Sequence, residues 1–352
     1  MVGITLGLQI ATGLALAMNY TAHIDHAFDS IEHIMRDVKF GWLLRYMHSN
    51  GGSMIFFLLY AHMARGLYYQ SYKHPRTHVW MSGSLIFILM AGTAFLGYVL
   101  PWGQMSYWGA TVITNILTAV PIFGEPIVVW IWGGFSIGNA TLTRFYGLHF
   151  LLPFVIAALA VLHLLILHRT GSSNPVGVDS SIDSIRFFPY FFLKDVLAFL
   201  AFMLFFMYTV CYQPNLFGHP DNYIKANPMV TPTHIVPEWY SLPFYAILKS
   251  IPSKIGGAAA MGLSMACLFI LPLVDTSKRS WVESKFLVDF TFALIIVDVI
   301  LLGWLGGKAP SPVFVALNQF LTFYYFFHFF VVIPALSYFE NNAITKWLYN
   351  EA

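Results

Sequence analysis

Long apolar stretches that lack charged residues divide the chain into segments of membrane-spanning length. About 20 apolar residues cross the hydrocarbon core of a bilayer as a helix, and a helix satisfies its own backbone hydrogen bonds there. The pattern predicts eight spans, near 1–21, 44–70, 79–100, 143–168, 192–212, 255–273, 286–306 and 315–338. The predicted fold is therefore all-α, a polytopic transmembrane helix bundle with about eight spans.

The connections between these spans are of two kinds. Most are short, and a modest excess of Lys and Arg in them places the amino terminus on the negative side of the membrane, the matrix or cytoplasm. Two long connections, 103–142 and 213–254, are rich in Gly, Pro and Trp and fall on the positive side. We expect them to pack against the membrane domain. The first apolar segment has no basic region before it and no small-residue cleavage signal, which predicts a retained helix.

Composition supports a membrane protein and excludes several other classes. Only 10% of the 352 residues are charged, against about 25% in soluble domains. The net charge is +2 and there is no basic cluster, so nucleic acid is not an expected partner. Cys211 and Cys267 lie in apolar stretches and form neither CxxC nor CxxCH. We expect two buried thiols and no disulfide, zinc ribbon or covalently attached heme.

Four histidines inside predicted spans share one spacing. His48 and His62 lie on the second span, His149 and His163 on the fourth, and each pair is fourteen residues apart. Fourteen residues turn about 1400°, roughly 40° short of four full turns, so each pair shares one helix face. The same spacing rises about 21 Å along the helix. Each helix therefore offers one histidine near each membrane surface.

The second and fourth spans run in the same direction because a single span separates them. This matches His48 with His149 in depth, and His62 with His163. Two imidazoles saturate heme iron and favour electron transfer, and bundle cores commonly house such cofactors. We predict two non-covalent b hemes. A satisfied core histidine is the alternative for each residue taken singly, and zinc is disfavoured because each depth supplies only two nitrogens.

Arginines and glycines add weaker support. Arg45 and Arg65 lie one turn from His48 and His62 toward the nearer membrane surface, where heme propionates need cations, although interfacial snorkelling is an alternative. Gly83 and Gly97 on the third span are also fourteen apart, and so could let a flat macrocycle approach the backbone at both depths. With 26 glycines in the chain, this spacing could arise by chance.

The chain resembles the cytochrome b family of mitochondrial and bacterial quinol–cytochrome c reductases along nearly its whole length. The motifs are RYMHSNGGS at 45–53, LYAHMARGLYYQSY at 59–72, GYVLPWGQMSYWGATVITN at 97–115, HRTGSSNP at 168–175, DNYIKANP at 221–228 and PEWY at 237–240. The resemblance implies one heme on His48 and His149 near the positive side, and another on His62 and His163 near the negative side.

Two further comparisons with the family refine this reading. The cytochrome b of photosynthetic complexes usually has one more residue between the ligands of the fourth span and is split, so the equal spacings favour the respiratory type. Family members normally carry some tens of residues before the first span, and a glycine pair within it. Gly13 matches the second glycine, and the chain starts too late to contain the first. We expect a divergent start, or a neighbouring subunit that supplies this surface.

The resemblance also implies two quinone sites. It assigns the segment 108–114, together with the side chains Glu238, Tyr240, Tyr98 and Tyr245, to a quinol-oxidising site. A partly buried glutamate can accept a quinol proton. Without the resemblance, Pro237-Glu238-Trp239-Tyr240 would read as a tight interfacial turn.

On the negative side the resemblance assigns His168, Ser172 and Asp195 to a quinone-reducing site. His168 is five residues past His163 and points about 140° away from it, so it is a poor second heme ligand. Polar residues at helix ends are the alternative reading. We expect Asp298 to be a hydrogen-bonded structural residue.

These observations predict a diheme subunit that oxidises quinol near the positive side and reduces quinone near the negative side, coupling electron flow to proton translocation. Residues 1–170 would form the diheme-binding four-helix bundle, and residues 171–352 a carboxy-terminal transmembrane domain with the PEWY loop. The substrate would be ubiquinol and ubiquinone. The chain would be the catalytic subunit of a quinol–cytochrome c oxidoreductase.

The same reading predicts partners and a location. We expect an iron–sulfur subunit, a cytochrome c-type subunit and further subunits in a dimeric complex, because this chain has no iron–sulfur or heme c motif. The mitochondrial inner membrane is the expected location, with the bacterial cytoplasmic membrane as the alternative. Two rival functions are a transporter that relays protons through its histidines and a diheme anchor of another dehydrogenase. The PEWY and 97–115 motifs argue against the anchor.

Overall fold

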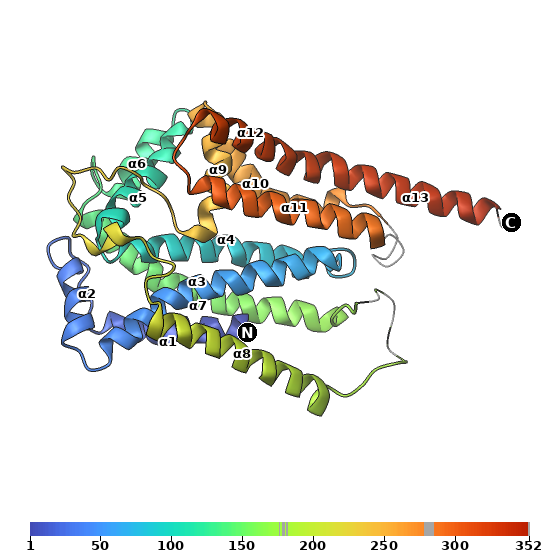
Figure 1. The fold of residues 1–352 in the computed structure, drawn as a ribbon, viewed down its shortest axis with the longest axis horizontal. Helices are drawn as coiled ribbons and strands as arrows, with labels where there is room; N and C mark the ends of the chain where they lie inside the picture. The colour runs from blue at the N-terminus through green and yellow to red at the C-terminus, as the bar shows by residue number, and fades with distance from the viewer. Residues whose placement is uncertain (176, 178–179, 181, 278–284, 351–352) are drawn as a thin grey trace. The chain divides into compact units, whose positions relative to one another are not determined.

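Helices make up nearly all the regular structure of the chain, as the hydrophobic pattern predicts. The computed structural model describes residues 1–175, 177, 180, 182–277 and 285–350, and its ribbon is drawn in Figure 1. The helices are α1 Val2–Ala17, α2 Ala27–Arg36, α3 Gly41–Tyr68, α4 Thr77–Val99, α5 Gln104–Asn115, α6 Gly124–Trp132, α7 Asn139–Thr170, α8 Phe192–Tyr212, α9 Leu242–Ser250, α10 Lys254–Val274, α11 Lys285–Gly306, α12 Pro312–Phe327 and α13 Ile333–Asn350. The all-α fold is confirmed.

Six of the described helical segments are long and apolar enough to cross a membrane. They are Thr77–Val99, Asn139–Thr170, Phe187–Tyr212, Lys254–Val274, Phe286–Gly306 and Pro312–Asn342. The last of these joins α12 to α13 through a π-helical turn, His328–Val332. The predicted total of eight adds α1, which has only 16 residues, and α3, which is interrupted by histidines and arginines. That these two helices also cross the membrane stays a prediction.

Local sequence explains where several helices begin and end. Ser253 and Ser311 cap α10 and α12, each accepting a hydrogen bond from a backbone N–H three residues later. Pro312 follows Ser311 at the first helical position, where its missing N–H costs nothing. Gly133 ends α6 with φ of +71°, a left-handed conformation that glycine adopts freely. These signals place the helix ends close to the predicted span limits.

The chain divides into two compact units. The first contains Met1–Tyr60, Leu89–Ala158 and Asp183–Tyr240, and the second contains Ala61–Ile88, Leu159–Ile182 and Ser241–Ala352. Helices α3, α4 and α7 each contribute residues to both units. The predicted boundary near residue 170 stays a prediction, since each unit combines segments from both sides of it.

In the first unit, α1, α3, α4 and α7 come together through hydrogen bonds. Gln9 on α1 donates to the backbone oxygen of His48 on α3, at 2.9 Å. His149 on α7 bonds the backbone oxygen of Thr93 on α4, at 2.8 Å. These contacts join α1 to α3 and α4 to α7 beside the first histidine pair.

In the second unit, polar contacts hold the connection between α3 and α4. Tyr72 donates to Asp275 at 2.5 Å, and Lys73 forms an ion pair with the same carboxylate at 3.2 Å. Arg76 donates to the backbone oxygens of Gly171 and Ser172 at 2.9 and 3.1 Å. The connection therefore fixes the backbone just after α7.

The structure departs from two expectations about individual side chains. Cys267 is buried as predicted, but Cys211 is exposed on α8. An apolar stretch predicts burial in protein or in lipid alike, and most of α8 faces outward. Asp298 is buried, yet neither of its carboxylate oxygens has a hydrogen-bond partner among the described residues. The expected hydrogen-bonded role for Asp298 is therefore not observed.

Candidate functional site

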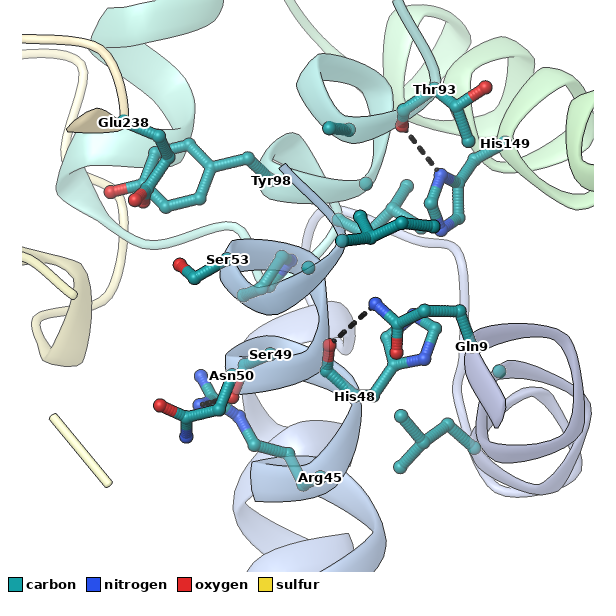
Figure 2. A pocket seen from close by; sticks show the side chains of 18 of the residues that line it. Gln9, Arg45, His48, Ser49, Asn50, Ser53, Thr93, Tyr98, His149 and Glu238 are labelled. Atoms are coloured by element: carbon teal, nitrogen blue, oxygen red, sulfur yellow. Dashed lines mark hydrogen bonds between the residues drawn. The ribbon is translucent and has the colours of Figure 1, made fainter. Parts of the chain in front are cut away.

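The first histidine pair faces across the first unit. The rings of His48 and His149 have centroids 6.2 Å apart and are nearly perpendicular, at 88°. Figure 2 shows them approaching from α3 and α7 within one pocket. The depth matching predicted from spacing alone therefore brings these two side chains together.

The second pair repeats this arrangement in the second unit. The rings of His62 and His163 have centroids 6.5 Å apart, with an angle of 69° between their planes. Each pair therefore has one histidine on α3 and one on α7. The two histidines on each helix are fourteen residues apart.

Both separations fit one metal ion between two imidazoles. A metal–imidazole bond is about 2.0–2.1 Å long, and the ring nitrogen lies roughly 1.1 Å from the ring centre by standard covalent geometry. Two such ligands on opposite sides of one ion place their centroids about 6 Å apart. The two histidines of each pair would therefore be the residues that hold a heme iron, which would supply an electron carrier. Among the described residues, no cluster of three or more His, Cys, Asp or Glu side chains forms a rival metal site.

The outer nitrogens of three rings are held by hydrogen-bond acceptors. His48 Nδ1 lies 3.0 Å from Thr12 Oγ1, and His163 Nδ1 lies 2.9 Å from Ser82 Oγ. His149 Nδ1 lies 2.8 Å from the backbone oxygen of Thr93. A hydrogen bond from Nδ1–H leaves Nε2 as the basic nitrogen, which is the usual arrangement for a histidine that ligates a metal.

His62 differs from the other three rings. Its Nδ1 lies 3.2 Å from Arg65 Nη2, and a guanidinium can only donate. In this contact Nδ1 is the acceptor and the ring proton sits on Nε2, the nitrogen that a metal would need. Heme binding at His62 therefore requires Arg65 to turn away from the ring, consistent with the predicted bond from Arg65 to a propionate.

The predicted glycines lie beside the histidines of the same level. A Cβ built on Gly13 would come within 3.0 Å of His48 Cε1, and one on Gly83 within 3.1 Å of His163 Cε1. On Gly97 the corresponding distance to His149 Cε1 would be 2.4 Å. Any larger side chain would displace the ring, so these three positions keep space open around the histidines. Their contact with a macrocycle stays a prediction.

Aromatic contacts anchor the PEWY loop on α3. Tyr240 stacks on Phe56 with ring centroids 3.9 Å apart, and its backbone oxygen accepts a hydrogen bond from Tyr60. The indole Nε1 of Trp239 donates to Ser53 Oγ at 3.1 Å. These contacts fix the backbone on the carboxyl side of Glu238 in the first unit.

Glu238 lies in a largely apolar environment. Burial raises the pKa of its carboxyl to about 7, although a hydrogen bond from Tyr98 and the charge of Arg45 both favour the ionised form. A carboxyl with this pKa can take up and release a proton near neutral pH. Figure 2 shows Glu238 and Tyr98 lying together on the opposite side of the pocket from the histidines.

One cavity of about 290 Å³ in the first unit is lined by His48, His149, Glu238, Tyr98 and Tyr240. Arg45 also lines it, and donates to Ser49 Oγ at 3.2 Å. The cavity therefore combines a candidate iron site with a candidate proton acceptor.

The remaining predicted quinol-site residues lie outside this cavity lining. The segment 108–114 belongs to α5 in the first unit. Tyr245 belongs to α9 in the second unit, with Lys249 Nζ 4.7 Å from its ring centroid.

The predicted quinone-reducing residues are divided between the units. His168 lies in the last turn of α7 and is exposed. Ser172 follows it in the segment that Arg76 holds, and both belong to the second unit. Asp195 lies in the first turn of α8, in the first unit. The roles of all three residues stay predictions.

The hydroxyl partners of the histidines were missed by the sequence analysis. Thr12 precedes Gly13 directly, and Ser82 precedes Gly83 directly. A hydroxyl residue next to a glycine on a span adjacent to the histidines was therefore an available signal, but only packing shows which ring each one meets.

Two pairs of facing histidine rings in a bundle of apolar helices are typical of membrane-bound electron-transfer proteins. Comparison with known proteins gives the family. Sequence models of the families cytochrome b/b6/petB and cytochrome b (C-terminal)/b6/petD match residues 1–171 and 225–326. The chain belongs to the cytochrome b family, which binds b-type hemes and transfers electrons in the respiratory chain.

Individual relatives support this assignment over nearly the whole chain. The cytochrome b of Rickettsia bellii is 54% identical over 341 residues, which cover 96% of this chain and 85% of the relative. That of Chondrus crispus is 54% identical over 338 residues, covering 96% and 89%. A solved structure described as hyperthermophilic respiratory Complex III matches with a TM-score of 0.92 and 35% identity, over 97% of this chain and 90% of the other. The protein is thus a multi-pass membrane subunit of a multi-subunit respiratory complex.

Proposed function

We propose that this chain oxidises quinol in the first unit and reduces quinone in the second, with one b heme on each histidine pair. The observation that carries the proposal is the shared cavity of the first unit, because quinol oxidation needs acceptors for electrons and for protons at one place. His48 and His149 would hold the heme there, and Glu238 lines the same cavity. When bound, the heme supplies an electron acceptor.

The protein's own part in quinol oxidation is to position a base. The Glu238 carboxylate accepts a proton from a quinol hydroxyl, and the Tyr98 hydroxyl donates a hydrogen bond that orients this carboxylate. The stacking of Tyr240 on Phe56 holds the loop in place, and the apolar lining excludes competing water. Because His168 and Ser172 lie in the second unit with His62 and His163, we assign quinone protonation to His168, with Ser172 assisting.

Partners and location follow from the same proposal. The second electron of quinol leaves through an iron–sulfur subunit to a cytochrome c-type subunit, in a dimeric complex with further subunits. We propose the mitochondrial inner membrane as the location, with the bacterial cytoplasmic membrane as the alternative. Ubiquinol is the proposed substrate.

The test is the variant Glu238→Gln, with Glu125→Gln as control because Glu125 is exposed on α6. We expect Glu238→Gln to slow quinol-driven cytochrome c reduction by about 10²–10⁴-fold, the usual contribution of a general base, and to leave both heme spectra intact. Unchanged turnover in Glu238→Gln across the pH range would assign this residue to structure and remove the proposed base.

A further inference from the structure

The connection between α3 and α4 is anchored to one buried carboxylate. Asp275 directly follows α10, and only 8% of the residue is exposed. Tyr72, which is also buried, donates a hydrogen bond to Asp275 Oδ2 at 2.5 Å, and Lys73 Nζ lies 3.2 Å from Asp275 Oδ1. Two consecutive residues of the connection therefore meet the same carboxylate.

Asp275 is itself held by the segments around it. Its Oδ1 accepts hydrogen bonds from the backbone N–H of Ser277 at 3.2 Å and from Ser337 Oγ on α13 at 2.9 Å. A buried carboxylate needs a paired cation and hydrogen-bond donors to offset its lost hydration, and Asp275 has both. It therefore provides a fixed point for a connection that, as a loop, would otherwise be mobile.

Two hydrogen bonds within the connection carry this fixed position toward Arg76. The backbone N–H of Arg76 donates to the backbone oxygen of Lys73 at 2.8 Å. The Oγ1 of Thr77 donates to the backbone oxygen of Tyr72 at 3.2 Å. The turn between Lys73 and Arg76 is thus closed by its own hydrogen bonds, so the Arg76 side chain begins at a position that Asp275 helps to define.

Arg76 in turn holds the segment that follows α7. Its guanidinium donates to the backbone oxygens of Gly171 and Ser172 at 2.9 and 3.1 Å. Ser71, also in the connection, has its Oγ 2.9 Å from Ser173 Oγ. The connection therefore contacts three consecutive residues, and it holds Ser172 by the backbone without using the Ser172 hydroxyl. All of these residues belong to the second unit.

We propose that Asp275 is a positioning residue for quinone reduction in the second unit. Asp275 holds the connection, Arg76 holds the backbone of Ser172, and the Ser172 hydroxyl is thereby placed to meet quinone. This inference rests on the quinone-reducing role proposed for Ser172. A segment that is already ordered loses less conformational freedom when its ligand binds, so the anchor strengthens quinone binding.

The proposal predicts an effect on quinone binding rather than on the proton donor. His168 lies within α7, and that helix sets its position independently of the connection. Loss of the Asp275 anchor should therefore raise the quinone concentration at which reoxidation is half-maximal, and leave the maximal rate nearly unchanged. A residue that only stabilised the fold would lower the amount of intact complex without changing this half-saturating concentration.

Stopped-flow reoxidation of the heme proposed for the second pair, measured over a range of ubiquinone concentrations in the intact complex, tests this split. Asp275→Asn removes the charge that pairs with Lys73 at nearly constant volume. It should raise the half-saturating concentration by about tenfold or more, since a misplacement of about 1 Å can cost 10²-fold. Reduction of the complex by quinol should stay at the native rate. An unchanged half-saturating concentration would overturn the proposal.

Asp289→Asn is the matched control for this measurement. Asp289 lies on α11 in the same unit and also accepts a hydrogen bond from a tyrosine, Tyr68 Oη at 2.9 Å. Tyr68 belongs to α3 rather than to the connection. This variant should keep the native half-saturating concentration. A rise equal to that of Asp275→Asn would show that loss of any such carboxylate has the same effect, and would overturn the proposal.

The Ser172→Ala background separates this inference from the assignment on which it rests. Ser172→Ala should itself raise the half-saturating concentration, and Asp275→Asn should add nothing to it, because both act through one hydroxyl. A full additional effect in the double variant would overturn the proposal. If Ser172→Ala has no effect, the role assigned to Ser172 fails, and the inference with it. An effect of Ser172→Ala without one of Asp275→Asn refutes the positioning alone.

Arg76→Lys keeps the proposal testable should Asp275→Asn fail to fold. Arg76 is partly exposed and lysine keeps its charge, but an ammonium lacks the planar fork that donates to two oxygens at once. This variant should raise the half-saturating concentration and leave the maximal rate nearly unchanged. A native value in Arg76→Lys would show that the segment after α7 keeps its position without the connection, and would overturn the proposal.

Discussion

The two histidine pairs share a spacing and a geometry but differ in what surrounds them. Ring centroids are 6.2 Å apart in the first pair and 6.5 Å apart in the second. In the first pair both outer nitrogens meet acceptors, and the cavity between the rings also reaches Glu238. In the second pair His62 meets the guanidinium of Arg65. Helix periodicity therefore repeats the histidine pair, whereas the neighbouring side chains differ between the two pairs.

Removing one histidine of a pair should produce the largest difference between the two pairs. His149→Leu should abolish the heme proposed for the first pair, and His163→Leu that proposed for the second, because each heme would lose one of the two histidines that hold it. Pyridine hemochrome assays of the purified complex should show two hemes in the native protein and one in each variant. Acid acetone should extract both native hemes. Heme retained after extraction, or two hemes in either variant, would contradict the assignment.

The pH dependence of quinol oxidation tests the proton acceptor that we propose beside the first pair. Below pH about 7 the Glu238 carboxyl is protonated and cannot accept a proton, so turnover should rise as pH increases through about 7. Glu238→Gln should be slow at every pH and lack this rise. Steady-state cytochrome c reduction between pH 5 and 9 measures the effect. If Glu238→Gln keeps the native pH profile, another group is the base.

The corresponding test at the second pair is His168→Leu. His168 follows His163 by five residues and points away from it, so its loss should remove a proton donor without removing a heme ligand. We expect the heme on His62 and His163 to be reduced normally but to be reoxidised by quinone more slowly, by about 10²-fold or more. Stopped-flow spectroscopy measures this step. Loss of that heme's absorption band would instead indicate damage to binding, and normal reoxidation would place the quinone-reducing site elsewhere.

The smallest expected effect concerns the hydroxyl partners of the rings. Thr12→Val removes the acceptor of His48 Nδ1, and Ser82→Ala removes that of His163 Nδ1. The ligand then becomes a weaker donor to the oxidised iron, so the midpoint potential of that level alone should rise. We expect tens of millivolts, since a tenfold change in relative affinity is about 59 mV for one electron. A redox titration in which both potentials move equally would show that the two levels are not independently tuned.

The sequence by itself determined the long apolar helices and the pairing of the four histidines. Apolar segment lengths predicted the membrane helices to within a few residues, and the fourteen-residue spacing predicted which histidines face each other. Both inferences depend on helix geometry, which repeats every 3.6 residues and is therefore readable from local sequence. The motifs likewise identified the family that the comparisons confirmed.

Only the tertiary structure decided the contacts around those histidines. Thr12 lies 36 residues from His48 and Ser82 lies 81 from His163, and no local pattern specifies such pairings. Packing likewise left Asp298 without a partner and brought Glu238 beside Tyr98. Periodicity determines which face of a helix a residue occupies, whereas the partner on that face depends on how helices distant in sequence pack against one another.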